Sequence, residues 1–388
     1  MYRLGDYEFS LRELSGAMGD FGTLLPIAVG FIVVNGMHPT DFLVVFGVTN
    51  IVTGLIYRAP MPLQPMKAIA AVAIAGSWAP DLISATALSM GMFWLLLSCF
   101  SQVEDALKRT PESVIRGIQL ALGISLGWTG LQMILPNRWL IGLAALIIIG
   151  YLSRGRRRNP AALVVFVLGM LIMLYDGTLD LASADFALPS LQIPDPSLAW
   201  EGMMRAGAGQ IPLTLSNAVV ACAALLREYF PHRDISERRL MRNMGVMNVL
   251  ASLFGGFPMC HGAGGLASQY YFGARTGGAN VLEGTLEILL GVVFGATLLS
   301  FFSNFPMPII GAMMIVVGIE LGRFSQTLRS PAWPAAGVTV ALSLIFNLGV
   351  GFVGGLATEL LIQRWLSGRN PDHPGCIRDE DILRNDDS

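Results

Sequence analysis

Long apolar segments, separated by short charged or Pro- and Gly-rich loops, recur along the whole chain and limit its fold more than any other feature. About 20 consecutive apolar residues are enough to cross a bilayer as a helix. Hydrophobic residues make up 53% of the 388 residues and charged residues only 13%, which is far from an ordinary soluble domain. Because a helix satisfies its own backbone hydrogen bonds in lipid, the pattern predicts an α-helical integral membrane protein.

We place seven apolar segments in each half of the chain. The first seven lie near residues 11–34, 41–57, 61–76, 84–103, 113–135, 139–153 and 160–175. The second seven lie near residues 208–226, 237–254, 259–273, 281–303, 306–322, 332–347 and 350–366. The segments that begin at Met61 and Met259 are too short for a full span, so we expect half-helices there. The prediction is fourteen segments, or twelve spans if the two short ones are re-entrant.

Basic residues gather in every second loop, for example in "SRGRRR" and "REYFPHRDISERRLMR". The opposite loops contain only Arg138 and Arg205 among the basic residues. Since cytoplasmic loops carry the excess of Lys and Arg, this alternation predicts that both termini are cytoplasmic. The first 16 residues lack the pattern of a cleaved signal, so the first segment is expected to remain as a span.

Composition and cysteine spacing exclude several other classes of function. The net charge is −2 and no long basic run is present, which argues against nucleic acid as a partner. The four cysteines show no C-x-x-C spacing, so neither a disulfide framework nor a thiolate metal site is indicated. We therefore expect no metal and no cofactor.

An internal repeat links the two halves. "GVTNIVTGLIYRAPM" (Gly47 to Met61) aligns without gaps to "GVMNVLASLFGGFPM" (Gly245 to Met259), at an offset of 198 residues. Because seven segments, an odd number, lie in each half, the second copy is inverted in the membrane. Inverted repeats of this kind are typical of secondary transporters. The expected domains are a first repeat at 1–180, a second repeat at 200–367 and a short polar cytoplasmic tail at 368–388.

Proline and glycine break the chain at the start of both short segments, "PLQPMKAIAAVAIAG" and "CHGAGGLASQYYFG". Non-helical backbone at membrane depth is tolerated only where it is buried in protein or lines a polar cavity. The N-terminal ends of both half-helices are expected to converge there, and such ends favour an anion. Gly262, Gly264 and Gly265 let a ligand approach the backbone closely.

Two charged residues lie close to these breaks. Lys67 is in the first turn of a half-helix, where its charge is unfavourable without an anion or a carboxylate nearby. Asp20 lies in "SGAMGDFGTLLP", where we expect it to pair with Lys67, to carry a coupling proton, or to do both. Two alternatives stay open: Lys67 extends to the cytoplasmic surface, and Asp20 caps the helix that starts near Thr23.

Further polar residues lie inside the apolar segments. Gln210, Thr214 and Asn217 follow helical spacing and share one face, either toward a substrate or simply between helices. Glu283 and Glu287 also share a face, as proton carriers or as partners of Arg275. A second acidic group is expected to be interfacial and comprises Glu320, beside Arg323, and Glu359.

The motifs "GDFGTLLP", "PLQPMKAIAA" and "FPMCHGAGGLASQYYFGARTGG" resemble signatures of the molybdate transporter family, distant relatives of the SulP sulfate permeases. "PESVIRGIQLALGISLGWTGLQ" is similar to the fifth segment of sulfate permeases. The resemblance implies an all-α polytopic fold with a seven-plus-seven inverted repeat and core and gate subdomains, like uracil permease. Only about 22 polar residues follow the last segment, so we expect no STAS domain.

The resemblance also implies an oxyanion held between the third and tenth segments, with proton coupling. Carried onto this chain, it indicates the following substrate-binding residues: Asp20, Phe21, Gly22, Thr23, Gln64, Met66, Lys67, Ala68, Gln210, Thr214, Asn217, His261, Gly262, Ala263, Gly264 and Gly265. The candidates for proton coupling are Asp20, His261, Glu283 and Glu287. His261 either donates to the anion, titrates near neutral pH, or is a histidine satisfied at a helix cap.

The hypothesis is a non-enzymatic carrier that imports molybdate across a bacterial cytoplasmic (inner) membrane by elevator-like movement of the core against the gate. Sulfate and tungstate share the shape and charge of molybdate, so the family likeness alone selects molybdate. Membrane lipid and a second copy of the chain, as a homodimer, are the other expected partners.

Several alternatives differ in class. A sulfate or other oxyanion transporter, or an anion channel, needs only the same fold. Nucleobase transport requires a carboxylate that faces the base edge, and "GAGG" suits a tetrahedral anion better. An intramembrane aspartyl protease requires a "YD" motif before a "GxGD" motif. Here Asp20 precedes Tyr175-Asp176, and Ala17 stands where the motif needs glycine.

Overall fold

The computed structural model describes residues 2–100, 111–135, 138–152, 161–178, 186–323 and 333–369. The side chains of the following residues are outside the described part: 2, 3, 20–23, 161–163, 296, 300, 320, 321, 323 and 366–369. The first half opens with a hairpin of β1 (Tyr2–Leu4) and β2 (Tyr7–Phe9). The elements that follow are α1 (Leu11–Ala17), η1 (Met18–Asp20), α2 (Phe21–Val33), α3 (Pro39–Tyr57), β3 (Gln64–Pro65), α4 (Lys67–Ala75), α5 (Pro80–Leu97), α7 (Glu112–Ile134), α8 (Trp139–Leu152) and α9 (Ala161–Tyr175).

The second half begins with one long, irregular helix that contains two π-helical stretches. Its parts are α10 (Pro196–Gly202), η2 (Met203–Gly207), α11 (Ala208–Thr214), η3 (Leu215–Ala221) and α12 (Cys222–Tyr229). The remaining elements are α13 (Glu237–Ser252), β4 (Met259–Cys260), α14 (Ala263–Phe272), α15 (Gly278–Ser303), α16 (Met307–Arg323), α17 (Trp333–Ile345) and α18 (Leu348–Arg369).

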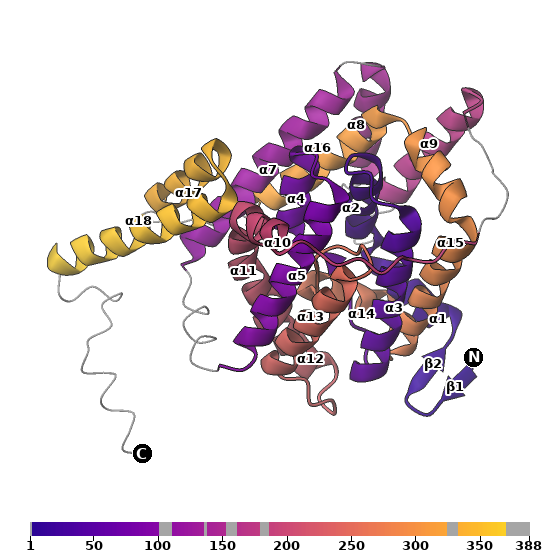
Figure 1. Cartoon of the computed structure of the whole chain (residues 1–388), viewed down its shortest axis with the longest axis horizontal. Helices are drawn as coiled ribbons and strands as arrows, with labels where there is room; N and C mark the ends of the chain where they lie inside the picture. The colour runs from indigo at the N-terminus through magenta and orange to yellow at the C-terminus, as the bar shows by residue number, and fades with distance from the viewer. Residues whose placement is uncertain are drawn as a thin grey trace.

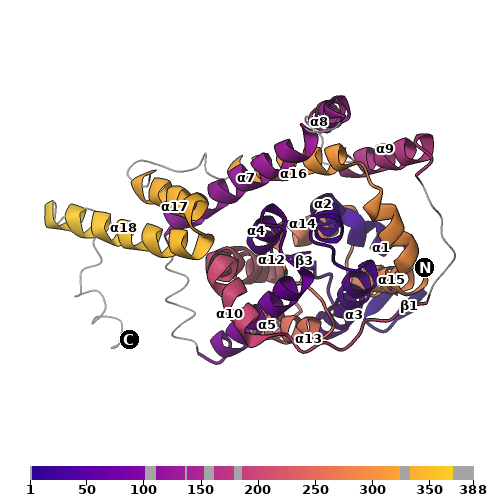
Figure 2. The same cartoon turned by 45° about the horizontal axis from the view of Figure 1, so that its top comes forward.

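The helices form two bodies (Figure 1). Figure 2 shows α7, α8, α9, α16, α17 and α18 along one side of the molecule, with α2, α3, α4, α5, α13, α14 and α15 gathered beside them. We call the first group the gate body and the second group, with α1 and the α10–α12 helix, the core body. Within the gate body, α7 packs most extensively against α16 and α17, and α17 packs against α18.

Packing in the core body interlocks the two halves of the chain. Helix α3 of the first half packs mainly against α15 of the second, and α5 of the first half packs mainly against α13 of the second. The repeat offset relates these two pairs, since α3 and α13 begin at Pro39 and Glu237, and α5 and α15 begin at Pro80 and Gly278. Neither half can therefore form this body alone.

Each of the fourteen predicted segments has a helical counterpart, and both predicted half-helices are present. Helix α4 has nine residues and α14 has ten. Within the described residues, five helices are long and apolar enough to span a membrane: Pro39–Tyr57, Pro80–Leu97, Glu112–Ile134, Pro196–Tyr229 and Gly278–Gly295. A sixth results if Thr297–Ser303 and Met307–Ile319, bent by 83°, are counted as one span.

One predicted boundary is wrong. The sequence places the start of the eighth segment near residue 208, but its helix already begins with α10 at Pro196. The Asp195 side chain caps this helix by accepting the Ser197 N–H at 2.7 Å, and Pro196 supplies a φ that suits a first turn. The predicted tail lies outside the described residues from residue 370 onward, and the repeat boundaries stay a prediction.

Glycine brings the backbones of α7 and α16, the most extensively packed helix pair of the gate body, into contact. A Cβ built on Gly123 of α7 would lie 2.5 Å from the Gly318 carbonyl oxygen of α16, and one on Gly318 would lie 2.6 Å from the Gly123 oxygen. Small residues drive helix association in lipid because they allow such close approach. The reciprocal contact is what an approximate two-fold relation between α7 and α16 produces.

We expect Gly123→Ala to lower the free energy of unfolding by about 1–3 kcal/mol, because the added methyl group forces α7 and α16 apart. Thermal unfolding of the purified protein in detergent measures the change. Gly127→Ala is the matched control on the same helix, since a Cβ at Gly127 meets nothing within 4 Å. Equal melting temperatures for the two variants would contradict the close contact.

Candidate functional site

The two half-helices begin where the extended segments β3 and β4 cross. The strands pair antiparallel, with Gln64 opposite Cys260 and Pro65 opposite Met259. The Met66 N–H extends the pairing by donating to the Pro258 carbonyl oxygen at 2.8 Å. A residue before proline is restricted to extended backbone, which keeps this stretch from continuing as helix. The crossing therefore satisfies non-helical backbone in the interior.

Asparagine side chains support the backbone where each segment enters the crossing. Asn248 of α13 brackets Met259, accepting its N–H and donating to its carbonyl oxygen, both at 2.7 Å. Asn280 of α15 brackets Met61 in the same way, at 2.9 and 2.6 Å. Both asparagines are fully buried. Sequence reasoning missed them as functional residues, although the repeat alignment contained the signal, since Asn248 is one of its shared positions.

The N-terminus of α4 carries the charge expected of an anion site. Lys67 is the first residue of the helix and is half-buried, and Met66 provides no side-chain cap. Within the described residues, Lys67 forms no hydrogen bond and no ion pair. The Ala68 N–H donates to Gln210 Oε1 at 2.7 Å, so an amide oxygen occupies one position that an oxyanion would take.

The N-terminus of α14 is the more open of the two. Gly262 precedes the helix and provides no side-chain cap. A Cβ at Gly262 would lie 2.7 Å from Gln64 Oε1, so a larger residue there would displace the Gln64 side chain of β3. Gly264 is exposed, and a Cβ there meets nothing within 4 Å, whereas Ala263 and Gly265 are buried. A ligand can therefore reach the backbone at Gly264.

His261 does not face this opening. It is fully buried, and its Nδ1 lies 3.2 Å from the Pro62 carbonyl oxygen while Nε2 lies 3.2 Å from Asn243 Nδ2. An amide nitrogen can only donate, so Nε2 accepts and Nδ1 carries the hydrogen. With both ring nitrogens used, His261 joins the two crossing segments, and the alternative of a satisfied structural histidine describes it best.

The predicted polar face of the eighth segment is correct in part. Gln210 and Thr214 are buried, and Gln210 Nε2 donates to Thr214 Oγ1 at 2.7 Å. Asn217 is exposed and does not share their environment. The reason is the π-helical stretch Leu215–Ala221, which changes the number of residues per turn directly after Thr214.

Residues 20–23 lie at a break in the first segment. A short 3₁₀ turn ends at Asp20 and α2 begins at Phe21, as expected from the glycines around it. Ser268 Oγ of α14 donates to the Gly19 carbonyl oxygen at 2.7 Å, which holds this break beside the tenth segment. The side chains of Asp20, Phe21 and Thr23 lie outside the described part, and the exposure of Gly22 is not described either. The Asp20–Lys67 pair therefore stays a prediction.

The remaining acidic candidates have separate environments. Glu283 and Glu287 are buried on one face of α15, and Asn50 Nδ2 of α3 donates to Glu287 Oε2 at 2.9 Å. Arg275 instead directs its guanidinium to the Tyr270 and Ala274 carbonyl oxygens. Glu359 accepts from Ser113 Oγ at 2.8 Å, so it joins α18 to α7. The side chains of Glu320 and Arg323 lie outside the described part.

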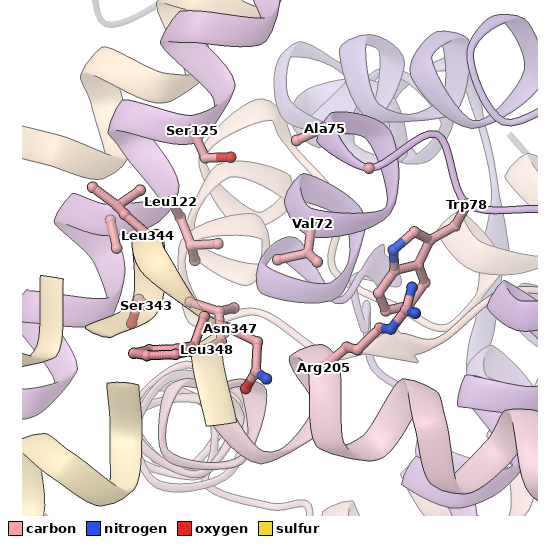
Figure 3. Close-up of a pocket in the computed structure, with 13 residues that line it drawn as sticks. Val72, Ala75, Trp78, Leu122, Ser125, Arg205, Ser343, Leu344, Asn347 and Leu348 are labelled. Carbon is pink, nitrogen blue, oxygen red and sulfur yellow. The ribbon is translucent and has the colours of Figure 1, made fainter. Parts of the chain in front are cut away.

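A cavity of about 470 Å³ lies between the core and gate bodies, at the C-terminal end of α4 (Figure 3). Val72 of α4, Ser125 of α7, Arg205 of η2 and Asn347, between α17 and α18, contribute to its walls. None of the predicted site residues lines it. At 1.5 Å per helical residue, Val72 is roughly 8 Å along α4 from Lys67.

Comparison with known proteins adds independent information. The family model described as "Molybdate transporter of MFS superfamily" matches residues 12–126 and 202–321. Molybdate transporter 2 of Arabidopsis thaliana is 33% identical, over 82% of this chain and 79% of its own length. Molybdate transporter 1 of the same plant is 31% identical, over 96% of this chain and 92% of its own length.

Two solved structures share the fold. The transmembrane domain of a cyanobacterium bicarbonate transporter, BicA, matches with a TM-score of 0.67 at 16% identity, over 89% of this chain and 97% of that one. Murine Solute Carrier 26 family member A9, an anion transporter in the inward-facing state, matches with a TM-score of 0.68 at 15% identity, over 94% and 70%.

The solved structures and the helix arrangement of this chain indicate the same fold. The seven-plus-seven inverted-repeat fold predicted from the sequence is confirmed. This fold differs from that of the MFS superfamily named in the family description, because the two halves of an MFS transporter are parallel repeats. Its relatives are transporters, and its several apolar helices are those of a membrane transporter. The chain belongs to the molybdate transporter family.

Proposed function

We propose that this chain imports molybdate as a secondary active carrier, with the oxyanion bound between the N-termini of α4 and α14. The observation that carries the proposal is the crossing of β3 and β4, from which two half-helices begin without side-chain caps. Free N–H groups and the positive ends of helix dipoles favour an anion there. The similarity to proteins named molybdate transporters is the reason to propose molybdate rather than another tetrahedral dianion.

Roles for individual residues follow from their positions. Lys67 supplies a positive charge beside the anion, and Gly264 leaves the backbone open to it. Gln210 holds the Ala68 N–H until the substrate arrives. The family resemblance adds Asp20, Phe21, Gly22 and Thr23 of the first segment to the site. Ser268 of α14 donates to the carbonyl oxygen of the preceding Gly19.

The division into two bodies supports elevator-like alternating access. Both half-helices belong to the core body, while the cavity lies where the core faces the gate. Arg205 lines this cavity and pairs with Glu201 at 2.6 Å, and it offers a positive group to an approaching anion. The core then moves against the gate to expose the site on the other side.

The direct test is uptake of radiolabelled molybdate into proteoliposomes that contain the purified protein. A carrier gives saturable uptake that increases when an inward proton gradient is imposed. Sulfate and tungstate, added as competitors at two pH values, show which dianion is preferred. Steeply voltage-dependent flux that needs no coupled gradient would instead identify an anion channel, and stronger competition by sulfate would identify a sulfate transporter.

We expect Lys67→Ala and Gly264→Val each to weaken molybdate binding at least about tenfold, which corresponds to ~1.4 kcal/mol. The first removes the charge at the helix end, and the second places a side chain where the ligand approaches. Isothermal titration of the purified protein measures both. Lys67→Arg retains the charge, and Gly127→Val adds the same bulk on α7, at a position where a Cβ meets nothing within 4 Å. Normal affinity in both test variants would remove the site assignment.

We expect Gln210→Glu to weaken molybdate binding by about tenfold or more, because a carboxylate beside the Ala68 N–H repels an incoming dianion. The uncharged variant Gln210→Leu removes the same acceptor without adding charge. Titration at low and at high ionic strength separates the two effects, since salt screens the repulsion. Equal losses in both variants at both salt concentrations would show that the anion binds elsewhere.

A further inference from the structure

Asn248 on Met259 and Asn280 on Met61 each form two hydrogen bonds to one backbone residue, and we call each such pair a clamp. The two asparagines do not occupy equivalent positions in the two repeats. Asn248 and Asn50 are equivalent positions, 198 residues apart, and so are Met259 and Met61. Asn248 brackets Met259 within its own repeat. Its equivalent Asn50 does not bracket Met61, because Asn280 from the other half of the chain holds that residue.

Asn50 instead connects this clamp to a carboxyl group. Asn280 Nδ2 donates to Asn50 Oδ1 at 3.0 Å, and Asn50 Nδ2 donates to Glu287 Oε2 at 2.9 Å. All three side chains are buried, with Glu287 5% exposed, Asn50 1% and Asn280 0%. A continuous chain of hydrogen bonds therefore runs from Glu287 to the backbone of Met61, and the second repeat shows no counterpart among the described residues.

Glu287 lies beside a close contact between α3 and α15. A Cβ on Gly47 would lie 2.6 Å from the Gly284 carbonyl oxygen and 3.1 Å from Glu287 Cβ. Glu287 is therefore buried beside a tightly packed part of the interface between α3 and α15. Within the described part of the chain, no basic side chain forms an ion pair with Glu287. A carboxyl group inside a membrane protein without a cationic partner marks a functional site by default.

The other ionisable groups on the elements packed around α15 have their own partners or lie at its ends. Glu283 is buried one turn away on α15 itself. In β2 and α1, Glu8 accepts from Arg12, and Glu13 accepts the backbone N–H groups of Arg275 and Thr276.

Helix α3 contributes Asp41 in its first turn and Tyr57 in its last, and the Tyr57 hydroxyl donates to the Arg239 carbonyl oxygen. Tyr7 of β2 donates its hydroxyl to the Leu55 carbonyl oxygen, and Arg58, after α3, pairs with Asp6. Helix α2 has no ionisable residue. Glu287 is thus the ionisable end of the hydrogen-bond chain that holds Met61.

We propose that Glu287 is the proton-binding site of this protein and that Asn280 and Asn50 are positioning residues that link its charge to the anion site. The inference rests on the proposed molybdate transport and specifies its coupling. With the carboxylate charged, its charge-assisted bond orients the Asn50 amide, and Asn50 in turn orients Asn280 on Met61. Protonation of the carboxylate by a proton from water removes the charge and weakens this orientation.

The segment between Met61 and α4 is suited to transmit that change. It contains Pro62 and Pro65, whose rings restrict φ, so a shift of Met61 moves Met66 and the start of α4 with it. Lys67 is the first residue of that helix. One of the two anion-binding ends is therefore connected to a proton site, while the other is held by Asn248 without an ionisable group.

The test compares molybdate affinity at pH 5.5 and pH 8 for the purified full-length protein, measured by isothermal titration. We expect the wild-type affinity to differ between the two pH values by about five- to a hundredfold, the usual range of coupling between two sites. Glu287→Gln keeps the shape and the acceptor oxygen but cannot change charge, so its affinity becomes independent of pH. Asn280→Leu likewise loses the pH dependence.

Asn248→Leu is the matched control, because it breaks the equivalent clamp in the other repeat, which ends on no ionisable group. This variant retains the pH dependence even if its affinity falls. Retained pH dependence in Glu287→Gln, or its loss in Glu283→Gln instead, would overturn the proposal. A wild-type affinity that does not change with pH would overturn it as well, and a wild type that binds no molybdate would refute the transport function itself.

Infrared difference spectroscopy provides a readout that does not depend on binding. Acidification of the wild type should produce the C=O band of a protonated buried carboxyl group, and Glu287→Gln should lack it while Asn248→Leu keeps it. Melting temperature and elution volume confirm that each variant is folded. An unchanged band in Glu287→Gln would assign the proton to another group and refute the proposal.

Discussion

Backbone hydrogen bonding in the interior of the membrane is the constraint on which the rest of this structure depends. The chain interrupts two helices there, and every N–H and C=O that leaves a helix needs a partner that lipid cannot provide. The short antiparallel pairing of β3 with β4 supplies some of these partners. The side chains of Asn248 and Asn280 supply others, on Met259 and Met61. The backbone N–H groups at the N-termini of α4 and α14 that have no such partner are available to bind an anion.

Meeting this constraint requires both halves of the chain at once. Each crossing strand has its partner in the other repeat, and the helices around them also pack across repeats, α3 on α15 and α5 on α13. In the gate body, Gly123 of α7 and Gly318 of α16 likewise bring helices from the two halves of the chain into backbone contact. The two repeats thus form one folding unit in the core, although each is recognisable separately in the sequence.

The approximate symmetry of the backbone does not extend to the chemistry of the site. The α4 end has a lysine and an amide already engaged by Gln210, whereas the α14 end has an exposed glycine. The clamp on Met61 continues to Glu287, whereas the clamp on Met259 ends within its own repeat. The proposed proton coupling requires a link between the anion site and Glu287, and among the described residues the asymmetry between the two repeats provides such a link on the α4 side only.

Much of the fold followed from the sequence alone. The apolar segments, the positive loops, the offset between Gly47 and Gly245 and the paired Pro- and Gly-rich breaks predicted the inverted repeat and both half-helices. These features could be read from the sequence because segment length, loop charge and helix-breaking residues depend on neighbouring residues only, and because the second half repeats the pattern of the first. The family likeness then indicated molybdate, which tetrahedral shape and charge alone do not distinguish from sulfate.

Contacts between distant residues were decided by the tertiary structure. Sequence spacing placed Asn217 beside Thr214, but a π-helical stretch turned it outward. It presented His261 as a possible anion donor, whereas Pro62 and Asn243 occupy both of its nitrogens. It gave no reason to connect Asn50, Asn280 and Glu287 with Met61. Such partnerships depend on which helices pack together and on small rotations about their axes, and neither is encoded in the spacing of residues along one segment.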